Sequence, residues 1–378
     1  MIIKKTPTVS IIIPTYNYGK FLHSTIQSAL SQNEYPCEII VVDDGSTDNT
    51  PKIVKQFLKS ITYVRQENAG LSSARNTGIS ISHGDYLQFL DADDLLGKGA
   101  VAAKVKIMEK NPSIGLVVCR NEFFHSEPIH WWSSFFVGAW RLYSDNLDIH
   151  LCFSNIAPPH AYLIRRDLAL SIGEFDTGLL ACEDYDYWLR ASFAGQVPVF
   201  SSNGKVYYRR HRASMSANCS QQTQWDAIMH IRLYNLMKKY PDFPENNRLS
   251  GLMAFLAGTL RTINRLCDYS LSVPIELYKI CEEAGGEIKK ESEKENININ
   301  LIFYFYLLLI EEHIESIKSK ESFKKNLRVF LIQALKNMRL PTKKSSIAWK
   351  SLKFALFDNK AGFIQRYKLA KTSIRSFI

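Results

Sequence analysis

Three aspartates within four residues follow a short apolar run at residues 86–90. The run is predicted to be a buried strand, and Asp91, Asp93 and Asp94 come directly after it. Neighbouring carboxylates repel one another and are costly to desolvate, so they do not stabilise a strand end. Carboxylate oxygens suit Mg²⁺ and Mn²⁺, which commonly also bind phosphate oxygens. We interpret Asp91 and Asp93 as candidate metal ligands, with a solvated turn as the alternative, and Asp94 as the cap of the next helix.

Polar residues also follow two earlier apolar runs. Tyr16 and Asn17 come after the run at 9–13, and Asp43 and Asp44 come after a second run at 38–42. A carboxylate can accept a hydrogen bond from an imide N–H, which uracil, thymine and guanine carry and cytosine lacks. An aromatic ring at a strand end either stacks on a base or packs on the core, and for Tyr16 we favour stacking.

Strands and helices alternate along the residues that position these side chains. Strands are predicted at 9–13, 38–42, 61–64 and 86–90, and helices at about 21–32, 53–58 and 72–81. Strands alternating with helices across short loops predict an α/β fold with a mostly parallel central sheet flanked by helices. In such sheets ligands bind outside the carboxyl ends of the strands. The unusual residues all fall at those ends, so we expect a single site.

The composition excludes several classes of protein. Seven scattered cysteines without a C-x-x-C pair favour the reduced thiols of a cytoplasm over a disulfide framework or a zinc site. The chain runs directly into its first strand, so we expect no signal peptide. The longest apolar run, residues 301–310, is half of the roughly 20 residues that a membrane-spanning helix needs.

The positive charge belongs to the end of the chain. The net charge is +10, whereas residues 318–378 alone hold sixteen Lys and Arg against two acidic residues. The preceding residues are therefore mildly acidic. A nucleic-acid-binding function inferred from net charge would rest on this tail alone.

Four motifs stand in an order and spacing that resemble the family 2 glycosyltransferases. They are SIIIPTYN at 10–17, VDDGSTD at 42–48, NAGLSSARNTG at 68–78 and FLDADD at 89–94. The resemblance covers roughly residues 8–220. It implies a GT-A fold, a nucleotide-sugar donor and, as is usual in the family, inversion of the anomeric centre.

The resemblance and the strand-end positions together indicate the donor site. We assign nucleotide-sugar contacts to Pro14, Thr15, Tyr16, Asn17, Asp43, Asp44, Arg75, Asp91 and Ala92. Asp44 is assigned to the hydrogen bond with the base of the nucleotide, and Asp43 is either a second contact to that base or a turn residue. The planar fork of Arg75 suits a pyrophosphate or a base edge, and the alternative is a surface ion pair. The implied cofactor is Mn²⁺ or Mg²⁺, with Asp93 as direct ligand and Asp91 facing the ribose and metal.

A later Glu-Asp pair resembles the family segment that delivers two carboxylates to a helix start. A sugar hydroxyl that attacks needs a general base within hydrogen-bond reach. A helix N-terminus favours an ionised carboxylate, so we assign Asp184 as the base and Glu183 as a residue that positions the acceptor. Trp188 lies one turn further and suits sugar stacking, and Asp186 and Arg190 have the spacing of an ion pair.

Two histidines complete the candidate site. His160 opens the second half of the site and is assigned to the acceptor. Residues 207–216 resemble the family's final motif, whose histidine, here His211, either binds the metal or pyrophosphate or is structural. The aromatic segment at 115–159 either lines the acceptor site or packs as a loop.

We expect a catalytic domain at 1–220 and a helical, basic region at 221–378. Helices are expected at 225–240, 249–266, 301–317, 323–338 and 347–377, with a charged linker at 282–300. Basic helices either bind an anionic membrane surface or form a bundle or homo-oligomer contact. We favour the membrane because proteins like this act on lipid-linked acceptors there.

The sequence thus predicts an inverting, metal-dependent glycosyltransferase, cytoplasmic and peripheral on the inner face of the membrane. It would move a sugar, most simply from a UDP-sugar, to a glycan acceptor that is lipid-linked. A nucleotidyltransferase is the first alternative, but residues 14–19 are not the Gly-rich basic loop it needs. A nucleic-acid-binding protein acting through the tail leaves the acids unexplained, and we expect no specific nucleic acid partner. The intact Asp93 and Asp184 argue against an inactive scaffold.

Overall fold

The computed structural model describes residues 8–125, 147–211, 214–244 and 248–294. The chain divides into two compact units, residues 1–247 and 248–378. The helix α9 (Cys219–Lys239) therefore belongs to the first unit, although we expected the domain boundary at 220. Every candidate site residue named above lies in the first unit.

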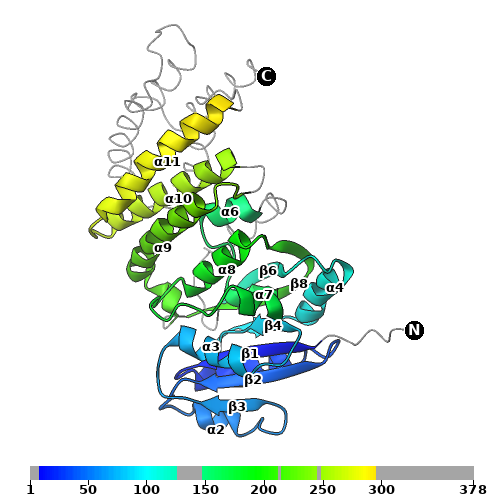
Figure 1. Ribbon diagram of the computed structural model, residues 1–378. Helices are drawn as coiled ribbons and strands as arrows, with labels where there is room; N and C mark the ends of the chain where they lie inside the picture. The colour runs from blue at the N-terminus through cyan, green and yellow to red at the C-terminus, as the bar shows by residue number, and fades with distance from the viewer. Residues whose placement is uncertain (1–7, 126–146, 212–213, 245–247, 295–378) are drawn as a thin grey trace, which may run out of the picture. The chain divides into compact units, whose positions relative to one another are not determined.

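The first unit is built on one mixed sheet (Figure 1). Its strands are β1 (Val9–Thr15), β2 (Cys37–Asp43), β3 (Thr62–Arg65), β4 (Tyr86–Phe89), β5 (Leu95–Leu96), β6 (Leu116–His125), β7 (Tyr162–Arg165) and β8 (Val199–Arg210). The strand order is β3-β2-β1-β4-β7-β6-β8-β5. The half from β3 to β4 is wholly parallel, and antiparallel pairs begin where β4 meets β7. The predicted α/β fold is confirmed.

Helices follow most strands, as the spacing of apolar residues predicts. They are α1 (Gly19–Leu30), α2 (Thr50–Val54), α3 (Leu71–Ile81), α4 (Ala100–Lys110), α6 (Leu147–Phe153), α7 (Arg166–Ser171) and α8 (Glu183–Phe193), with short 3₁₀ turns at Pro159–Ala161 and Met215–Ala217. The aromatic residues at 126–146 lie outside the described part of the chain.

A glycine lets α3 approach the sheet closely. The strand β1 is buried along its whole length, and α3 packs on β1 and β2. A Cβ atom added to Gly78 of α3 would stand 2.3 Å from Cγ2 of Ile12, far inside van der Waals contact. Gly78 therefore sets the distance between the helix and the strand, and so the position of every side chain that α3 carries.

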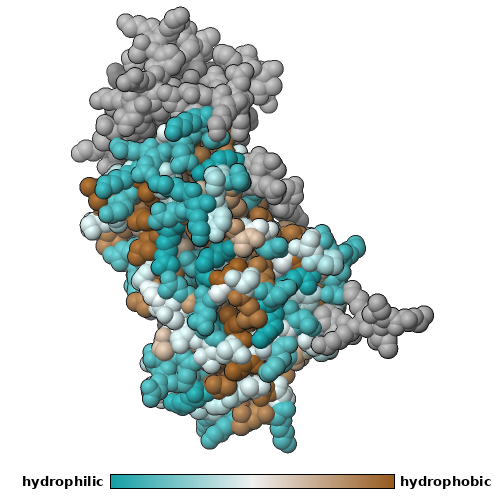
Figure 2. Space-filling view, in the orientation of Figure 1, coloured by the Kyte–Doolittle hydropathy of each residue, from teal (hydrophilic) through white to brown (hydrophobic). Residues whose placement is uncertain are grey.

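The described part of the second unit is a pair of helices, α10 (Arg248–Asp268) and α11 (Ile275–Lys294). The predicted helix at 249–266 is confirmed, but residues 282–294 belong to α11 and not to a linker. On the face drawn in Figure 2 hydrophilic side chains cover most of α11, although Ile275 is 63% exposed. The expected helices beyond residue 300 lie outside the described residues.

Among the described helices, none combines the length and the apolar character needed to cross a membrane.

Candidate functional site

The carboxyl ends of β1, β2 and β4 meet at one edge of the sheet. β1 pairs in parallel with both neighbours, and Thr15 stands opposite Asp43. The N–H of Asp44 donates to the carbonyl of Thr15 at 2.9 Å, which joins the two strand ends. Pro14 and Thr15 are themselves buried in β1. The structure therefore brings the strand-end residues to a common edge, as predicted.

The loop after β1 is shaped by Asn17 and exposes Tyr16. Asn17 has a φ of 59°, in the left-handed region that asparagine tolerates better than most residues. Its Oδ1 accepts hydrogen bonds from the N–H groups of Thr47 at 2.8 Å and Asp48 at 3.2 Å. Tyr16 is 45% exposed beside this junction. Tyr16 thus offers ring surface to a ligand, whereas Asn17 ties two loops together.

Asp44 is buried and organises the loop that leads into α3. Its Oδ1 accepts from Nε2 of Gln66 at 2.7 Å and from the N–H of Ala69 at 3.0 Å. Its Oδ2 accepts from the N–H of Gly70 at 2.8 Å. Gly70 has a φ of 92°, which favours glycine, and it precedes the first residue of α3. Asp44 therefore fixes the start of α3.

The sequence left Asp43 as either a second contact to the base or a turn residue, and its hydrogen bonds favour the turn residue. It is fully buried at the end of β2. Its Oδ1 accepts from the N–H of Ser46 at 2.7 Å, and its Oδ2 accepts from the hydroxyl of Tyr63 at 2.7 Å. With both oxygens used inside the protein and no exposed surface, Asp43 supports the turn, and its contact with a nucleotide stays a prediction.

Asp93 pairs with His211, the histidine that we expected either to bind the metal or pyrophosphate or to be structural. Oδ2 of Asp93 lies 2.9 Å from Nε2 of His211. Burial and the charge of Asp91 raise the pKa of Asp93, and the hydrogen bond with His211 partly opposes that rise. The end of β8 is thereby brought to the acidic turn after β4. Ala92, in the same turn, is buried and its carbonyl accepts from the hydroxyl of Thr25 at 2.8 Å.

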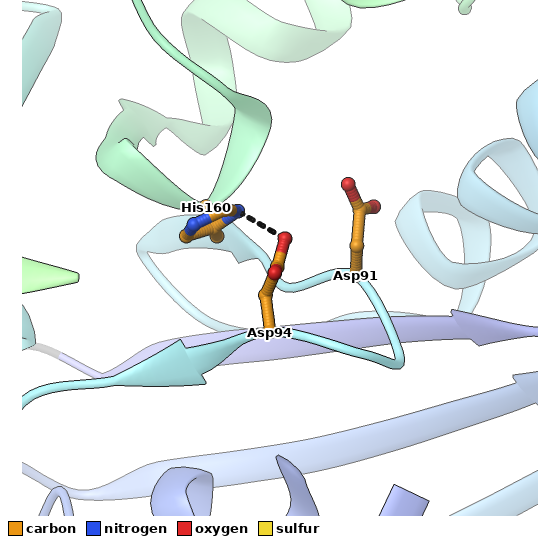
Figure 3. A group of neighbouring side chains, drawn as sticks. All are labelled: Asp91, Asp94 and His160. Atoms are coloured by element: carbon orange, nitrogen blue, oxygen red, sulfur yellow. Dashed lines mark ion pairs between the residues drawn. The ribbon is translucent and has the colours of Figure 1, made fainter. Parts of the chain in front are cut away.

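Asp94 is not the cap of the next helix, and that prediction is wrong. Its carboxylate is buried, and its Oδ1 accepts from the N–H of Arg209 at 2.6 Å. Its Oδ2 lies 3.1 Å from Nδ1 of His160 (Figure 3). The helix α4 instead begins after Gly99, which has a φ of 69°. Asp94 therefore ties the acidic turn to β8 and to the turn that carries His160.

The acidic turn and His160 supply a donor set that fits a divalent metal. Asp91, Asp94 and His160 each offer a ligand atom within 4.8 Å of the others (Figure 3). Burial, then the charges of Asp93 and Asp91, hold the pKa of Asp94 well above its usual value, and burial lowers the pKa of His160 to about 3. Neither ring nitrogen of His160 has hydrogen-bond geometry with any described residue. A cation relieves such crowding of carboxylates, and carboxylate and imidazole groups suit Mn²⁺.

Arg75 is neither a surface residue nor an unoccupied anion-binding group. Its side chain is 1% exposed. Nη2 donates to Oδ1 of Asp91 at 2.7 Å, and Nη1 donates to Oε1 of Glu183 at 2.6 Å. Burial alone lowers the pKa of Arg75, but the charges of Asp91 and Glu183 outweigh it and raise the pKa. Both arms of the predicted phosphate fork are thus held by carboxylates.

Asp184 stands at the start of α8 with a strongly shifted pKa. Nδ2 of Asn155 donates to its Oδ2 at 2.9 Å, and the N–H of Tyr185 donates to its Oδ1 at 2.7 Å. Burial, followed by the charge of Glu183, raises the pKa of Asp184 to about 7. We expected the helix N-terminus to favour the ionised carboxylate, whereas burial makes this carboxyl harder to ionise than an exposed aspartate. A pKa near neutrality suits a group that accepts a proton.

Two residues assigned to the acceptor do not fit that role. Trp188 is fully buried and its ring stacks on Tyr162, with centroids 4.2 Å apart. It has no exposed face on which a sugar can stack. His160 is also fully buried and faces Asp94. By contrast, the predicted ion pair between Asp186 and Arg190 is confirmed at 2.8 Å.

Sequence reasoning missed Asn155 and the role of Arg209. Asn155 lies in an irregular segment without periodicity, and no signal in the sequence links it to Asp184. Nε of Arg209 donates to the carbonyl of Asp93 at 2.6 Å, so Arg209 holds the acidic turn from β8. Its guanidinium carbon lies 4.8 Å from the ring centroid of Phe21 and 4.4 Å from that of Phe124. Its place between two rings depends on strand pairing that the sequence alone does not give.

Comparison with known proteins agrees with this geometry. A family model described as Glycosyl transferase family 2 matches residues 10–172. An uncharacterized glycosyltransferase of Rickettsia typhi, RT0329, is 35% identical over 238 residues, which are 62% of this chain and 74% of that protein.

Two solved structures share the fold. TarS 1-349 of S. aureus, in complex with UDP-GlcNAc, has a TM-score of 0.53 at 17% identity and covers 75% of this chain and 81% of its own. The mannosyltransferase PcManGT from Pyrobaculum calidifontis, in complex with GDP-Man and Mn²⁺, has a TM-score of 0.51 at 16% identity. The match covers 90% of this chain and 89% of the PcManGT chain. The predicted GT-A fold is thereby confirmed.

Proposed function

The chain belongs to glycosyl transferase family 2 and is a glycosyltransferase, and we propose that it transfers a sugar from a nucleotide diphosphate to a hydroxyl of a glycan with inversion. The observation that carries the proposal is the convergence of the strand-end site with Asp184. Arg75 bridges a carboxylate of the acidic turn and the carboxylate next to Asp184. The donor side and a proton acceptor thus share one site.

We propose that the donor base lies at the ends of β1 and β2. The exposed ring of Tyr16 offers a stacking surface. Asp44 accepts three hydrogen bonds, and a carboxylate has about four acceptor positions, so it retains capacity for an imide N–H. A UDP-sugar is the first candidate, since TarS was solved with UDP-GlcNAc. A GDP-sugar is the second candidate, since PcManGT was solved with GDP-Man.

A divalent cation, Mn²⁺ or Mg²⁺, fits the acidic turn. We propose Asp91, Asp93 and His211 as its ligands. The alternative set is Asp91, Asp94 and His160, whose ligand atoms lie within 4.8 Å of one another. Such a cation neutralises charge on a departing diphosphate. The protein's own contribution is the turn itself, which hydrogen bonds from β8 fix in place.

In the proposed reaction Asp184 accepts the proton of the attacking hydroxyl. The acceptor oxygen forms a bond to the anomeric carbon as the bond from that carbon to the diphosphate oxygen breaks. The proton passes to the carboxylate of Asp184, and the nucleotide diphosphate leaves with the bonding electrons. Asn155 orients the carboxylate through its hydrogen bond to Oδ2. A single displacement of this kind inverts the anomeric centre.

The substitution Asp184→Asn tests this role. It keeps the shape of the side chain but removes the proton acceptor, so transfer should fall by about a hundredfold or more. Nucleotide affinity should stay within about threefold, because Asp184 does not contact the donor base in the proposed arrangement. Transfer is measured as nucleotide diphosphate released in the presence of a glycan acceptor.

The matched control is Asp167→Asn, which changes the same residue type in the first turn of another helix. Asp167 is exposed at the start of α7 and accepts from the N–H of Leu168. This control should leave transfer unchanged. If Asp184→Asn transfers sugar at the wild-type rate, Asp184 is not the base.

We further propose that the acceptor is lipid-linked and that the chain meets it at an anionic membrane surface. The support is the surplus of Lys and Arg in residues 318–378, which lie outside the described residues. The full chain should co-sediment with vesicles containing anionic lipid and release them as salt rises. Equal binding to neutral vesicles would contradict an electrostatic contact.

A further inference from the structure

Arg75 is a buried cation that connects two distant parts of the chain. One arm of its guanidinium holds Asp91, which follows β4, and the other holds Glu183, the first residue of α8. Asp91 is 16 residues away along the chain and Glu183 is 108 residues away. Within the described residues, this single side chain therefore joins the acidic turn to the helix that begins with Glu183 and Asp184.

The charges around Arg75 leave no surplus positive charge for a phosphate. One guanidinium faces two carboxylates, so the group of three carries a net negative charge. A diphosphate that took one arm would leave a carboxylate without its partner, and for the buried Glu183 that is costly. The ring of Phe175 also packs on the guanidinium, whose carbon lies 5.2 Å from the ring centroid. The side chain is held at both arms and against a ring.

Arg75 and Glu183 affect Asp184 in opposite directions. The charge of Glu183 raises the pKa of Asp184, and the charge of Arg75 lowers it. Five titratable or charged groups surround Asp184. They are Glu183 of α8, Cys182 at the cap of α8, Arg75 of α3, Asp91 of the acidic turn and Tyr162 of β7. Burial raises the pKa of both Cys182 and Tyr162, which keeps them neutral near pH 7. The opposing charges are therefore those of Arg75 on one side and of Glu183 and Asp91 on the other.

We propose that Arg75 is a positioning residue that holds Glu183, and with it Asp184, at a fixed place relative to Asp91, and that it does not bind the donor diphosphate. The proposal rests on the proposed function for the role of Asp184. It differs from the expectation drawn from the sequence, in which the fork of Arg75 grips the pyrophosphate.

Two substitutions that break the same contact from opposite ends test the proposal. Arg75→Gln removes the cation and should move the acidic limb of the pH–rate profile to higher pH. Glu183→Gln removes the anion and should move that limb to lower pH. Both should lower kcat by about tenfold or more, and UDP affinity with Mn²⁺ should stay within about threefold of the wild type. Arg75→Lys keeps the positive charge but lacks the two-armed guanidinium. Its acidic limb should therefore stay at the wild-type pH, whereas its kcat should be lowered as in Arg75→Gln.

A second readout needs no turnover. In each background the gain in stability produced by Asp184→Asn reports how far the pKa of Asp184 is raised. That gain should be larger with Arg75→Gln and smaller with Glu183→Gln. If Arg75→Gln does not fold, Glu183→Gln still gives the direction of the shift, and Arg75→Lys still tests the loss of kcat without a shift.

The proposal is overturned if Arg75→Gln loses UDP affinity by about thirtyfold or more while kcat is kept, which is the result for a phosphate ligand. Shifts of the same sign in the two variants, or no shifts, also overturn it, because a purely structural contact moves neither readout. A wild-type chain that binds no nucleotide contradicts the proposed function instead, and the unfolding measurements still decide the role of Arg75.

Discussion

Asp184→Asn should abolish transfer and yet make the protein more stable. The folded protein holds a proton on Asp184 up to about pH 7, whereas an ordinary aspartate loses it near 3.8. Stability is therefore lost as the pH rises from about 4 to about 7, and the full cost is present above that range. A shift of about three pKa units corresponds to at most about 4 kcal/mol. The side chain of Asp184 is of intermediate burial, so solvent screening reduces the expected free-energy cost to about 2 kcal/mol.

Urea unfolding at two pH values measures this effect. Asparagine is neutral at every pH, so the variant avoids the cost that the wild type bears above about pH 7. The difference in unfolding free energy between variant and wild type should be small near pH 4 and should grow by about 2 kcal/mol at pH 8. Asp167→Asn, at an exposed helix start, should show no such growth. A difference that is constant with pH, or that favours the wild type at pH 8, would refute the raised pKa.

Two further predictions follow from the site and the core. The rate of transfer should rise with pH as Asp184 loses its proton and should level off above its pKa of about 7, whereas a rate that falls over this range contradicts a base at this position. Gly78→Ala should destabilise the protein by about 1–3 kcal/mol in urea unfolding, because the added Cβ meets Ile12. Its matched control, Gly285→Ala in α11, has no atom within 4 Å of the added Cβ and should stabilise by about 0.5–1 kcal/mol. Equal changes in unfolding free energy for Gly78→Ala and Gly285→Ala would contradict a destabilising contact between the added Cβ and Ile12.

The fold was largely predictable because its signals are local. Four β-branched residues at 9–13 predicted a buried strand, and helical spacing predicted the helices between strands. Once the order of strands and helices is known, the common edge of their carboxyl ends follows from topology. The predicted linker is wrong at residues 282–294 because α11 continues through these charged residues.

The site was less predictable because charge and burial depend on contacts between distant segments. The sequence identified Arg75 and Glu183, but not that they pair across 108 residues. Asp184 and Trp188 are one turn apart in α8, as the spacing predicts, but the ring of Tyr162 stacks on the ring of Trp188 and covers it. The pKa of Asp184 depends on burial, which no spacing in the sequence reveals.

In the proposed site a nucleotide diphosphate binds at the strand ends with the help of a divalent cation. Titration calorimetry with UDP, dTDP, GDP and CMP, each with and without Mn²⁺, tests it most directly. We expect manganese-dependent binding of one diphosphate, with UDP first, and the loss of this binding in Asp93→Ala. Binding that is unchanged by Mn²⁺ and by Asp93→Ala, or no binding to any of the four, would contradict it.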